Sequence, residues 1–263
     1  MTEITETMIK VRHQEELSDT PTTANRAMAV LSSMYSFSRK NYKDADNEPI
    51  IRHNPVSVLR EMELLYDERP CKTYVNDEMK PAWYESITSL ANKAAADLIL
   101  LEYLCGSRHG ETCRLRWENV DFNKRTFMLT GTKNGDDCLL PMSTQIEALL
   151  KRCRDRRSSE QEEWVFSAPT KLGHLDDIRE TVQASRDRIG KSDWSEHDLR
   201  RTFKTCCEKV EISYITQKHL MNHSLRHNVT AGYDGREIET LRAALQKVDD
   251  KLMELATVAA KPD

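Results

Sequence analysis

Apolar residues recur along most of this 263-residue chain at the three- and four-residue steps typical of amphipathic helices. The stretch ITETMIKVRHQEEL carries a modest apolar stripe, and a clearer helix starts around Pro21. We expect the buried stripe of that helix to contain Ala27, Val30, Leu31, Met34 and Phe37. A further helix starts behind Pro55, and its expected apolar side contains Val58, Leu59, Met62 and Leu65. Residues 1–67 therefore predict a small helical domain.

Helical patterns continue after a linker predicted at residues 68–75. Asn76 is a helix-start signal, and the apolar spacing from Ser86 to Leu104 predicts one continuous buried helix. Three later helices are predicted to begin at Ser143, Ser195 and Ser213, the last with Ile215, His219 and Leu220 in the core. Between them, VDFNKRTFMLTGTKNGDDCLLPM switches to short strands around a tight Asn134-Gly135 turn. The predicted fold class is mainly α with a small β-sheet (α+β).

The end of the chain carries a separate apolar stripe. Its members alternate at steps of four and three residues: Leu241, Leu245, Val248, Leu252 and Leu255. Such a stripe requires an apolar partner surface, which is either its own domain or a second copy of the chain. We therefore divide the remainder into a main domain at 76–235 and a C-terminal helix and tail at 236–263.

Composition narrows the class of protein. The chain is 38% hydrophobic and 31% charged, and its richest apolar run, AAADLILLEYLCG, is interrupted by Asp97 and Glu102 and is too short to span a bilayer. No secretory signal follows Met1, so we expect a cytoplasmic protein with no membrane partner. Seven cysteines without a C-x-x-C pair predict reduced packing thiols rather than a disulfide framework or a zinc site.

The charge balance is acidic, with a net charge of −4 and a pI near 6.1. This balance argues against a protein that holds nucleic acid by bulk charge alone. Residues 151–157, KRCRDRR, nevertheless carry five basic letters and one acidic letter. Such a run is more often a solvated helix face than a nucleic-acid contact, and we keep it as a secondary contact candidate.

Candidate chemistry is concentrated around two arginines. If Ser195 caps a helix, His197 and Arg200 share one face near its N-terminus, where backbone N–H groups favour an anion. Arg108 lies in the short break after Gly106, where Glu111 is close enough to orient it. Because arginine cannot ligate a metal, these residues predict a phosphate site and no metal. Taken alone, a His-x-x-Arg pair is more often a solvated helix face.

Together with Arg108 and Glu111, four further boxes follow in order: TKNG at 132–135, HDLR at 197–200, NHS at 222–224 and Tyr233. In this set the sequence resembles the tyrosine recombinases, the phage-type integrases. Two positions depart from the family pattern, which often has histidine where Arg201 stands and glycine where Asn222 stands. The resemblance implies a tyrosine-recombinase catalytic domain preceded by a truncated helical core-binding domain, which acts as a DNA clamp.

The resemblance also implies a role for each site residue. Tyr233 would attack a backbone phosphate to form a 3′-phosphotyrosyl intermediate, while Arg108 and Arg200 hold the non-bridging oxygens. Lys133 would protonate the leaving 5′ oxygen, His197 would help to deprotonate Tyr233 or hold the phosphate, and His223 would donate to the phosphate. No cofactor is implied. Without the resemblance, Lys133 is an exposed turn charge, His223 a structural histidine and Tyr233 a packed aromatic residue.

The implied partner is double-stranded DNA at attachment or recombination sites. We expect the protein to be a monomer without DNA and a homotetramer on DNA. Accessory DNA-bending proteins are further candidate partners. DNA-binding candidates are Arg26, Arg39, Lys40, Lys72 and Arg201. The expected function is integration or excision of a mobile element, such as a phage or genomic island, in the cytoplasm near the nucleoid. One alternative is a truncated DNA-binding integrase remnant without independent recombination activity. Another, with less support, is a type IB topoisomerase.

Overall fold

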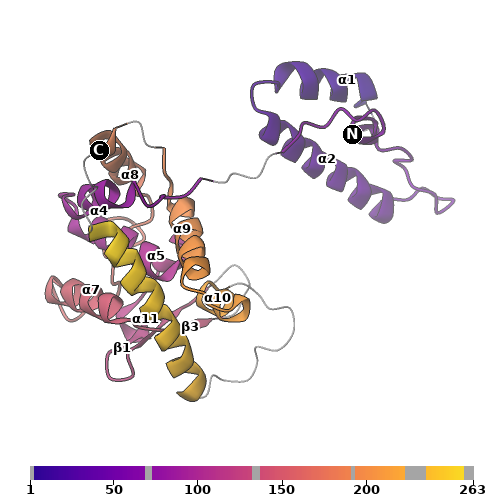
Figure 1. The fold of residues 1–263 in the computed structure, drawn as a ribbon. Helices are drawn as coiled ribbons and strands as arrows, with labels where there is room; N and C mark the ends of the chain where they lie inside the picture. The colour runs from indigo at the N-terminus through magenta and orange to yellow at the C-terminus, as the bar shows by residue number, and fades with distance from the viewer. Residues whose placement is uncertain (1–2, 69–72, 132–136, 191–192, 223–234, 258–263) are drawn as a thin grey trace. The chain divides into compact units, whose positions relative to one another are not determined.

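The computed structural model describes residues 3–68, 73–131, 137–190, 193–222 and 235–257. The chain forms two compact units, Met1–Lys72 and Thr73–Asp263, which are both drawn in Figure 1. The division falls inside the predicted linker at 68–75. In the part of the chain that is described, no helix is long and apolar enough to cross a membrane.

The first unit is helical. Its elements are α1 (Glu6–Val11), a π-helical turn (Arg12–Glu16), α2 (Pro21–Asn41), a 3₁₀ turn (Pro55–Ser57) and α3 (Val58–Glu61). Thr5 caps α1 by accepting from the Met8 amide at 3.2 Å, and Asn54 caps the 3₁₀ turn by accepting from the Val56 amide at 3.1 Å. The core of this unit is small and consists of Ile9, Met28, Tyr35, Val56, Val58 and Leu59.

The predicted buried stripe of α2 is wrong except at Leu31, which is partly buried and packs against the core of this unit. The helix buries Ala24, Met28, Tyr35 and Ser38, whereas Val30, Met34 and Phe37 are 62%, 51% and 59% exposed and Ala27 is also exposed. The helix has two apolar faces, and the one that carries Met28 and Tyr35 is buried because it packs against Ile9, Val56, Val58 and Leu59. Sequence spacing cannot distinguish between two such faces.

The predicted stripe after Pro55 is correct only at Val58 and Leu59, which are buried. Met62 and Leu65 are exposed, because α3 ends at Glu61 and Glu63 takes a left-handed backbone with φ of 53°. Residues beyond this point therefore no longer follow helical spacing.

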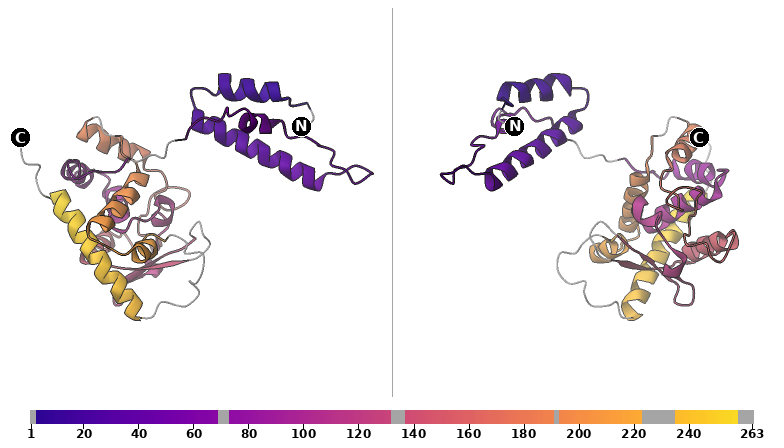
Figure 2. Two further views of the ribbon diagram at one scale, coloured as in Figure 1. Left: turned by 45° about the vertical axis from the view of Figure 1, so that its right-hand side comes forward. Right: turned by 180° about the vertical axis from the view of Figure 1, so that it is seen from behind.

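The second unit is mainly helical with one small sheet (Figures 1 and 2), as predicted. Its helices are α4 (Lys80–Thr88), α5 (Lys93–Cys105), α6 (His109–Thr112), a 3₁₀ turn (Trp117–Asn119), α7 (Thr144–Asp155), α8 (Arg179–Ile189), α9 (Glu196–Lys209), α10 (Tyr214–Leu220) and α11 (Gly235–Thr257). The antiparallel sheet has the order β1 (Val120–Asp121), β2 (Thr126–Leu129) and β3 (Cys138–Pro141). In its register Phe127 faces Leu140. The Asn134-Gly135 turn itself lies outside the described residues.

Helix α5 is the centre of this unit, because every residue from Ala95 to Cys105 is buried. The predicted continuous helix from Ser86 to Leu104 is wrong, since α4 ends at Thr88 and α5 begins at Lys93. The break has a local cause. Asn92 caps the new helix by accepting from the Ala95 amide at 3.1 Å.

The predicted serine caps are confirmed at the starts of α7 and α10. Ser143 accepts from the Ile146 amide at 3.1 Å, and Ser213 accepts from the Thr216 amide at 3.2 Å. Ser195 is the N-cap residue of α9, and its amide donates to the Asp198 carboxylate at 2.8 Å. Asn76 accepts from the Met79 amide, although α4 itself starts only at Lys80.

One expectation about a buried residue needs correction, and the contacts of the predicted basic run can be described. Ile215 is 62% exposed and not in the core, because α10 buries its opposite side through Gln217 and Leu220. The basic run at 151–157, our secondary DNA-contact candidate, is engaged within its own unit. There, Arg152 and Arg156 pair with buried Asp97, Arg154 lies over the Phe122 ring and Arg157 lies over the Trp117 ring. The six described cysteines are free and buried, as expected for packing thiols.

Helix α11 packs within its own unit, against α4, α9 and β3, as both figures show. Four residues of its predicted stripe are buried in the same core as α5: Leu241, Leu245, Val248 and Leu252. The Tyr103 hydroxyl on α5 donates to the Leu252 carbonyl at 3.1 Å. The partner surface of the stripe in this structure is therefore the chain's own second unit.

Candidate active site

Arg108 is held in the short connection between α5 and α6. Helix α5 ends at Gly106 in a left-handed conformation, with φ of 61°, where a Cβ atom would lie 2.6 Å from the Phe203 ring. Arg108 then caps α6 with its backbone, and its Nη1 donates to Glu111 Oε1 at 2.8 Å. Glu111 is buried whereas Arg108 is partly exposed. The carboxylate therefore fixes the guanidinium while leaving it accessible.

Arg200 projects from α9 to the same place and is only 6% exposed. Its Nη1 donates to the Gly106 carbonyl at 2.6 Å, and its Nη2 donates to the carbonyl of Met221, which follows α10. Burial, together with the charge of Arg108, lowers the pKa of Arg200 to about 10. The side chain still carries its positive charge at neutral pH.

The two arginines converge beside the segment that precedes His223. Arg108 Nη1 lies 3.5 Å from the Asn222 carbonyl, next to the Met221 carbonyl that Arg200 contacts. Asn222 has a left-handed backbone with φ of 47°. This conformation explains the sequence departure noted above, because asparagine is among the few residues other than glycine that tolerate it.

His197 lies on the exposed face of the first turn of α9. Burial by its surroundings, then the charges of Arg201 and Arg200, lower the pKa of His197 below its ordinary value. The ring is therefore neutral at pH 7 and can accept a proton.

Arg201 and Asp198 form an ion pair on α9, next to His197 in the sequence. Arg201 donates to Asp198 Oδ1 at 2.6 Å, and the Thr73 hydroxyl donates to the same oxygen at 2.7 Å. Burial alone would raise the pKa of Asp198, but hydrogen bonds from Thr73, Ser195 and Arg201 outweigh it and lower the pKa. Arg201, a DNA-binding candidate, is thus also a structural residue.

Sequence reasoning missed a second charged pair beside Arg108. His109 Nδ1 lies 2.8 Å from the buried Glu102 carboxylate, and its Nε2 lies 3.0 Å from the Asp176 carbonyl. Burial raises the pKa of Glu102 to about 7. Burial opposes the charge on His109, but hydrogen bonds with Cys113 and Glu102 raise its pKa to about 11. The signal in the sequence was a glutamate within the apolar run of α5.

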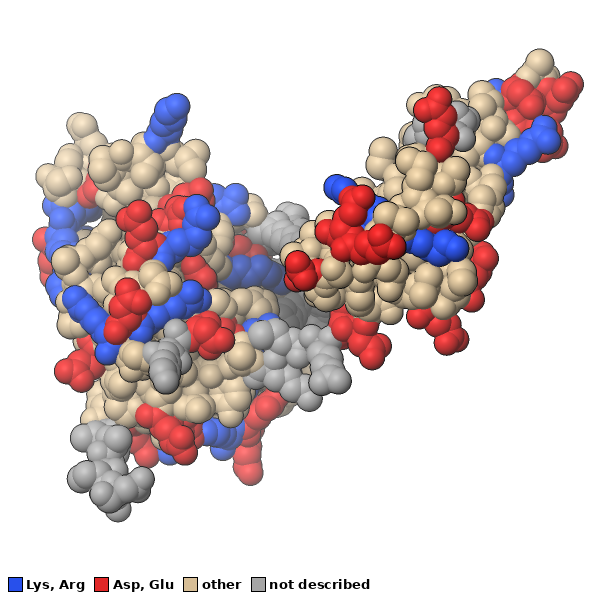
Figure 3. Space-filling model, turned by 90° about the horizontal axis from the view of Figure 1, so that it is seen from above, with Lys and Arg blue, Asp and Glu red and all other residues tan. Residues whose placement is uncertain are grey.

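The other candidate residues fall into two groups. Lys133, His223 and Tyr233, and the DNA-binding candidate Lys72, lie outside the described residues. Arg26, Arg39 and Lys40 are exposed on α2 of the first unit. Within the described ranges, no group of three His, Cys, Asp or Glu side chains could hold a metal ion. Acidic and basic side chains both occur on the face shown in Figure 3.

Solved structures identify the class of fold. The XerH site-specific recombinase in its post-cleavage complex with palindromic difH substrate matches with a TM-score of 0.67 and 17% identity, covering 99% of this chain and 74% of that one. A lambda integrase tetramer bound to a Holliday junction matches with a TM-score of 0.66 and 16% identity, covering 89% and 67%. The fold is that of the tyrosine recombinases.

The model of the phage integrase family matches residues 76–234, and the chain belongs to this family. Among curated relatives, the prophage integrase IntF of Escherichia coli (strain K12) is 25% identical over 186 residues, which cover 70% of this chain and 40% of that protein. Alignments that cover most of this chain span between 40% and 62% of the relatives' own length.

Proposed function

We propose that this protein is a site-specific DNA recombinase that cleaves and rejoins DNA strands through a 3′-phosphotyrosyl intermediate. The observation that carries the proposal is the convergence of Arg108 and Arg200, from two separate segments, beside Asn222. Arg200 is buried, and its described partners are uncharged backbone carbonyls. Its positive charge is therefore available to bind a phosphate. Family membership supports the same chemistry.

The proposed step is an in-line displacement at phosphorus. The Tyr233 oxygen forms a bond to phosphorus as the bond to the 5′ oxygen breaks, Lys133 protonates that leaving oxygen, and His197 accepts the tyrosine proton. Arg108 and Arg200 stabilise the extra negative charge, and His223 donates to the phosphate. At about 4 Å and an effective dielectric of about 20, each arginine contributes on the order of 4 kcal/mol before desolvation. The step conserves bond energy, so rejoining is its reversal with a new 5′ hydroxyl.

The proposed substrate is double-stranded DNA at attachment or recombination sites, bound by a tetramer. The solved relatives described above are bound to a recombination substrate and to a Holliday junction, the latter as a tetramer. The likeness to a prophage integrase supports a role in integrating or excising a mobile element. Accessory DNA-bending proteins and a location near the nucleoid belong to the same proposal.

We further propose that residues 1–67 form a helical core-binding domain that binds DNA. Helix α2 contains no acidic residue and exposes Arg26, Arg39 and Lys40. The alternative, DNA binding without recombination activity, is motivated by the acidic charge balance of the chain. The retention of the arginine site with its buried Glu111 favours the active enzyme.

Arginine substitution tests the proposal. On a nicked recombination-site DNA that traps the covalent product, Arg108→Ala and Arg200→Ala should each slow cleavage by about 100- to 1,000-fold, the cost of one transition-state donor. The exposed Arg179, which pairs with Asp177 on the surface, provides the control variant Arg179→Ala. Cleavage by both site variants at the parent rate would refute the phosphate site.

A further inference from the structure

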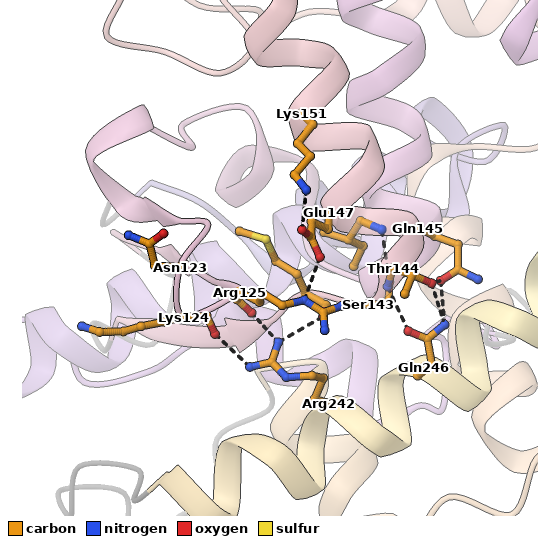
Figure 4. A network of polar contacts seen from close by, with 12 residues as sticks. Asn123, Lys124, Arg125, Ser143, Thr144, Gln145, Glu147, Lys151, Arg242 and Gln246 are labelled. Atoms are coloured by element: carbon orange, nitrogen blue, oxygen red, sulfur yellow. Dashed lines mark hydrogen bonds and ion pairs between the residues drawn. The ribbon is translucent and has the colours of Figure 1, made fainter.

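Helix α11 is joined to the sheet by a polar anchor in addition to its apolar face. The Arg242 side chain is 11% exposed and points from α11 toward the turn between β1 and β2 (Figure 4). Its Nη1 donates to the Met142 carbonyl at 3.1 Å and also to the Arg125 carbonyl. Its Nη2 donates to the Lys124 carbonyl at 3.0 Å. One guanidinium therefore satisfies three backbone acceptors.

These three carbonyls lie together at one end of the β2–β3 pair, where Thr126 pairs with Pro141 and away from the connection between the two strands. Lys124 and Arg125 precede β2, and Met142 follows β3. The Met142 amide donates to the Arg125 carbonyl at 2.8 Å, so this carbonyl accepts from both Met142 and Arg242. Arg125 has a left-handed backbone with φ of 52°, and its side chain pairs with Glu147 at 2.7 Å. Arg242 thus closes the base of the strand pair at a strained turn.

Gln246 provides a second contact one turn along α11. Its Oε1 accepts from the Thr144 amide at 2.9 Å, and its Nε2 donates to Gln145 Oε1 at 2.8 Å, as Figure 4 shows. The apolar contacts of Leu241 and Leu245 are non-directional and tolerate small shifts of the helix. Hydrogen bonds from a guanidinium are directional, so Arg242 and Gln246 set the position of α11 along the sheet.

We propose that Arg242 is a positioning residue for strand cleavage, which holds the base of the β2–β3 pair in fixed register with α11. This inference rests on the proposed function. In the sequence, Lys133 lies between β2 and β3, and α11 begins two positions after Tyr233. The anchor therefore links the chain segments that carry the proposed general acid and nucleophile. Without Arg242, the apolar face still holds α11, so the strand pair is the part that loses its support.

The first test does not depend on catalysis. Arg242→Met removes the donors but keeps an apolar stem, Arg242→Lys keeps the charge without the planar fork, and Lys247→Met removes an exposed cation from the same helix as a control. Hydrogen exchange of amides at 120–129 and 138–144 should accelerate by about tenfold in Arg242→Met, the effect of losing one net hydrogen bond. It should accelerate less in Arg242→Lys, and exchange at 248–257 should not change. Parent-like exchange at 120–129 and 138–144 in both Arg242 variants would overturn the anchor.

The second test separates the anchor from general folding. Arg242→Met should slow covalent-adduct formation by about 10- to 100-fold, the cost of a misplaced catalytic group, without weakening DNA binding. A DNA whose leaving 5′ oxygen is replaced by sulfur needs no general acid, so it should restore the rate of both Arg242→Met and Lys133→Ala. A loss that persists with the sulfur substrate would overturn the positioning role. If the parent chain forms no adduct, the proposed function fails. The hydrogen-exchange experiment still tests whether Arg242 stabilises the β2–β3 pair.

Discussion

Arg200 is the residue whose environment is most difficult to explain by stability alone. A buried guanidinium pays a desolvation cost, and its described contacts are the carbonyls of Gly106 and Met221 rather than a carboxylate. An apolar residue of similar volume at this position would give a folded state that is equally or more stable. The arrangement is therefore better explained by a need for positive charge at this position, beside Arg108.

His197 gives a prediction about pH. Its pKa lies below the ordinary value because of burial and of Arg201 and Arg200, so the neutral ring that accepts a proton persists to lower pH. We expect the cleavage rate to fall on the acid side only below about pH 6.5, and His197→Ala to lower the rate by about 100-fold or more and to remove this acid limb. Arg201→Gln should move the limb to higher pH, because one of the neighbouring positive charges is gone.

Rates measured from pH 5 to 8 under single-turnover conditions will decide this point. An acid limb that stays unchanged in His197→Ala would show that another group is the base. Arg179→Gln is the matched control, since Arg179 pairs only with the nearby Asp177 in the described contacts and should leave the limb in place.

At the scale of elements, α11 carries an unexpected acid in its buried face. Asp249 is fully buried, and burial raises its pKa well above the ordinary value, although the Ser143 hydroxyl opposes this rise. The folded state therefore keeps a proton that the unfolded chain releases above about pH 4. Because the unfolded state binds fewer protons, stability falls as pH rises from that point toward the folded-state pKa.

Asp249→Asn should remove this dependence while keeping the shape of the side chain. We expect the free energy of unfolding to rise by about 1 to 3 kcal/mol at pH 8 and by less at pH 5. Glu254→Gln, which removes an exposed carboxylate from the same helix, is the control. Urea unfolding at both pH values measures the effect, and an equal change at pH 5 and pH 8 would contradict the proton linkage.

Local chemistry made some elements predictable and left others ambiguous. Ser143 and Ser213 were identified because a cap is a short-range hydrogen bond that the sequence specifies directly. The break before Lys93 was missed because apolar residues continue through it on both sides. The exposed face of α2, with Val30 and Phe37, was mistaken for the buried one because burial depends on what packs against a helix, which periodicity does not contain.

The candidate site likewise contains residues that the sequence specifies and residues that only the structure reveals. Arg108, Glu111 and Arg200 could be chosen from motif order, and the structure brings them together. The His109–Glu102 pair and the Arg242 anchor could not be chosen in this way. The partners of Arg242 are the backbone carbonyls of Lys124, Arg125 and Met142, and any residue type provides a carbonyl. The His109–Glu102 pair is marked in the sequence only by a glutamate within an apolar run.

At the scale of the whole molecule, an acidic protein has to bind DNA through a limited set of cations. Arg26 and Lys40 are 14 residues apart on α2, which places them on nearly the same face about 21 Å apart along the helix. If each contacts a phosphate, Arg26→Ala or Lys40→Ala should weaken binding to all sequences alike and reduce the salt dependence of log K by about 1.

Fluorescence anisotropy titrations at several salt concentrations test this contribution. Arg52→Ala, a control in the same unit, removes an exposed arginine that lies near Asp44 and should leave the slope unchanged. Unaltered slopes for both Arg26→Ala and Lys40→Ala would remove the first unit from the DNA interface.

The most direct test of the whole account is covalent capture of DNA by Tyr233. A nicked, labelled recombination-site DNA incubated with the parent chain should yield a protein–DNA adduct that survives denaturation, because cleavage stores the strand as a 3′-phosphotyrosine. Tyr233→Phe deletes only the hydroxyl nucleophile, so it should bind the same DNA and form no adduct. An adduct that persists in Tyr233→Phe, or a parent chain that binds the site and forms none, would contradict the proposed recombinase.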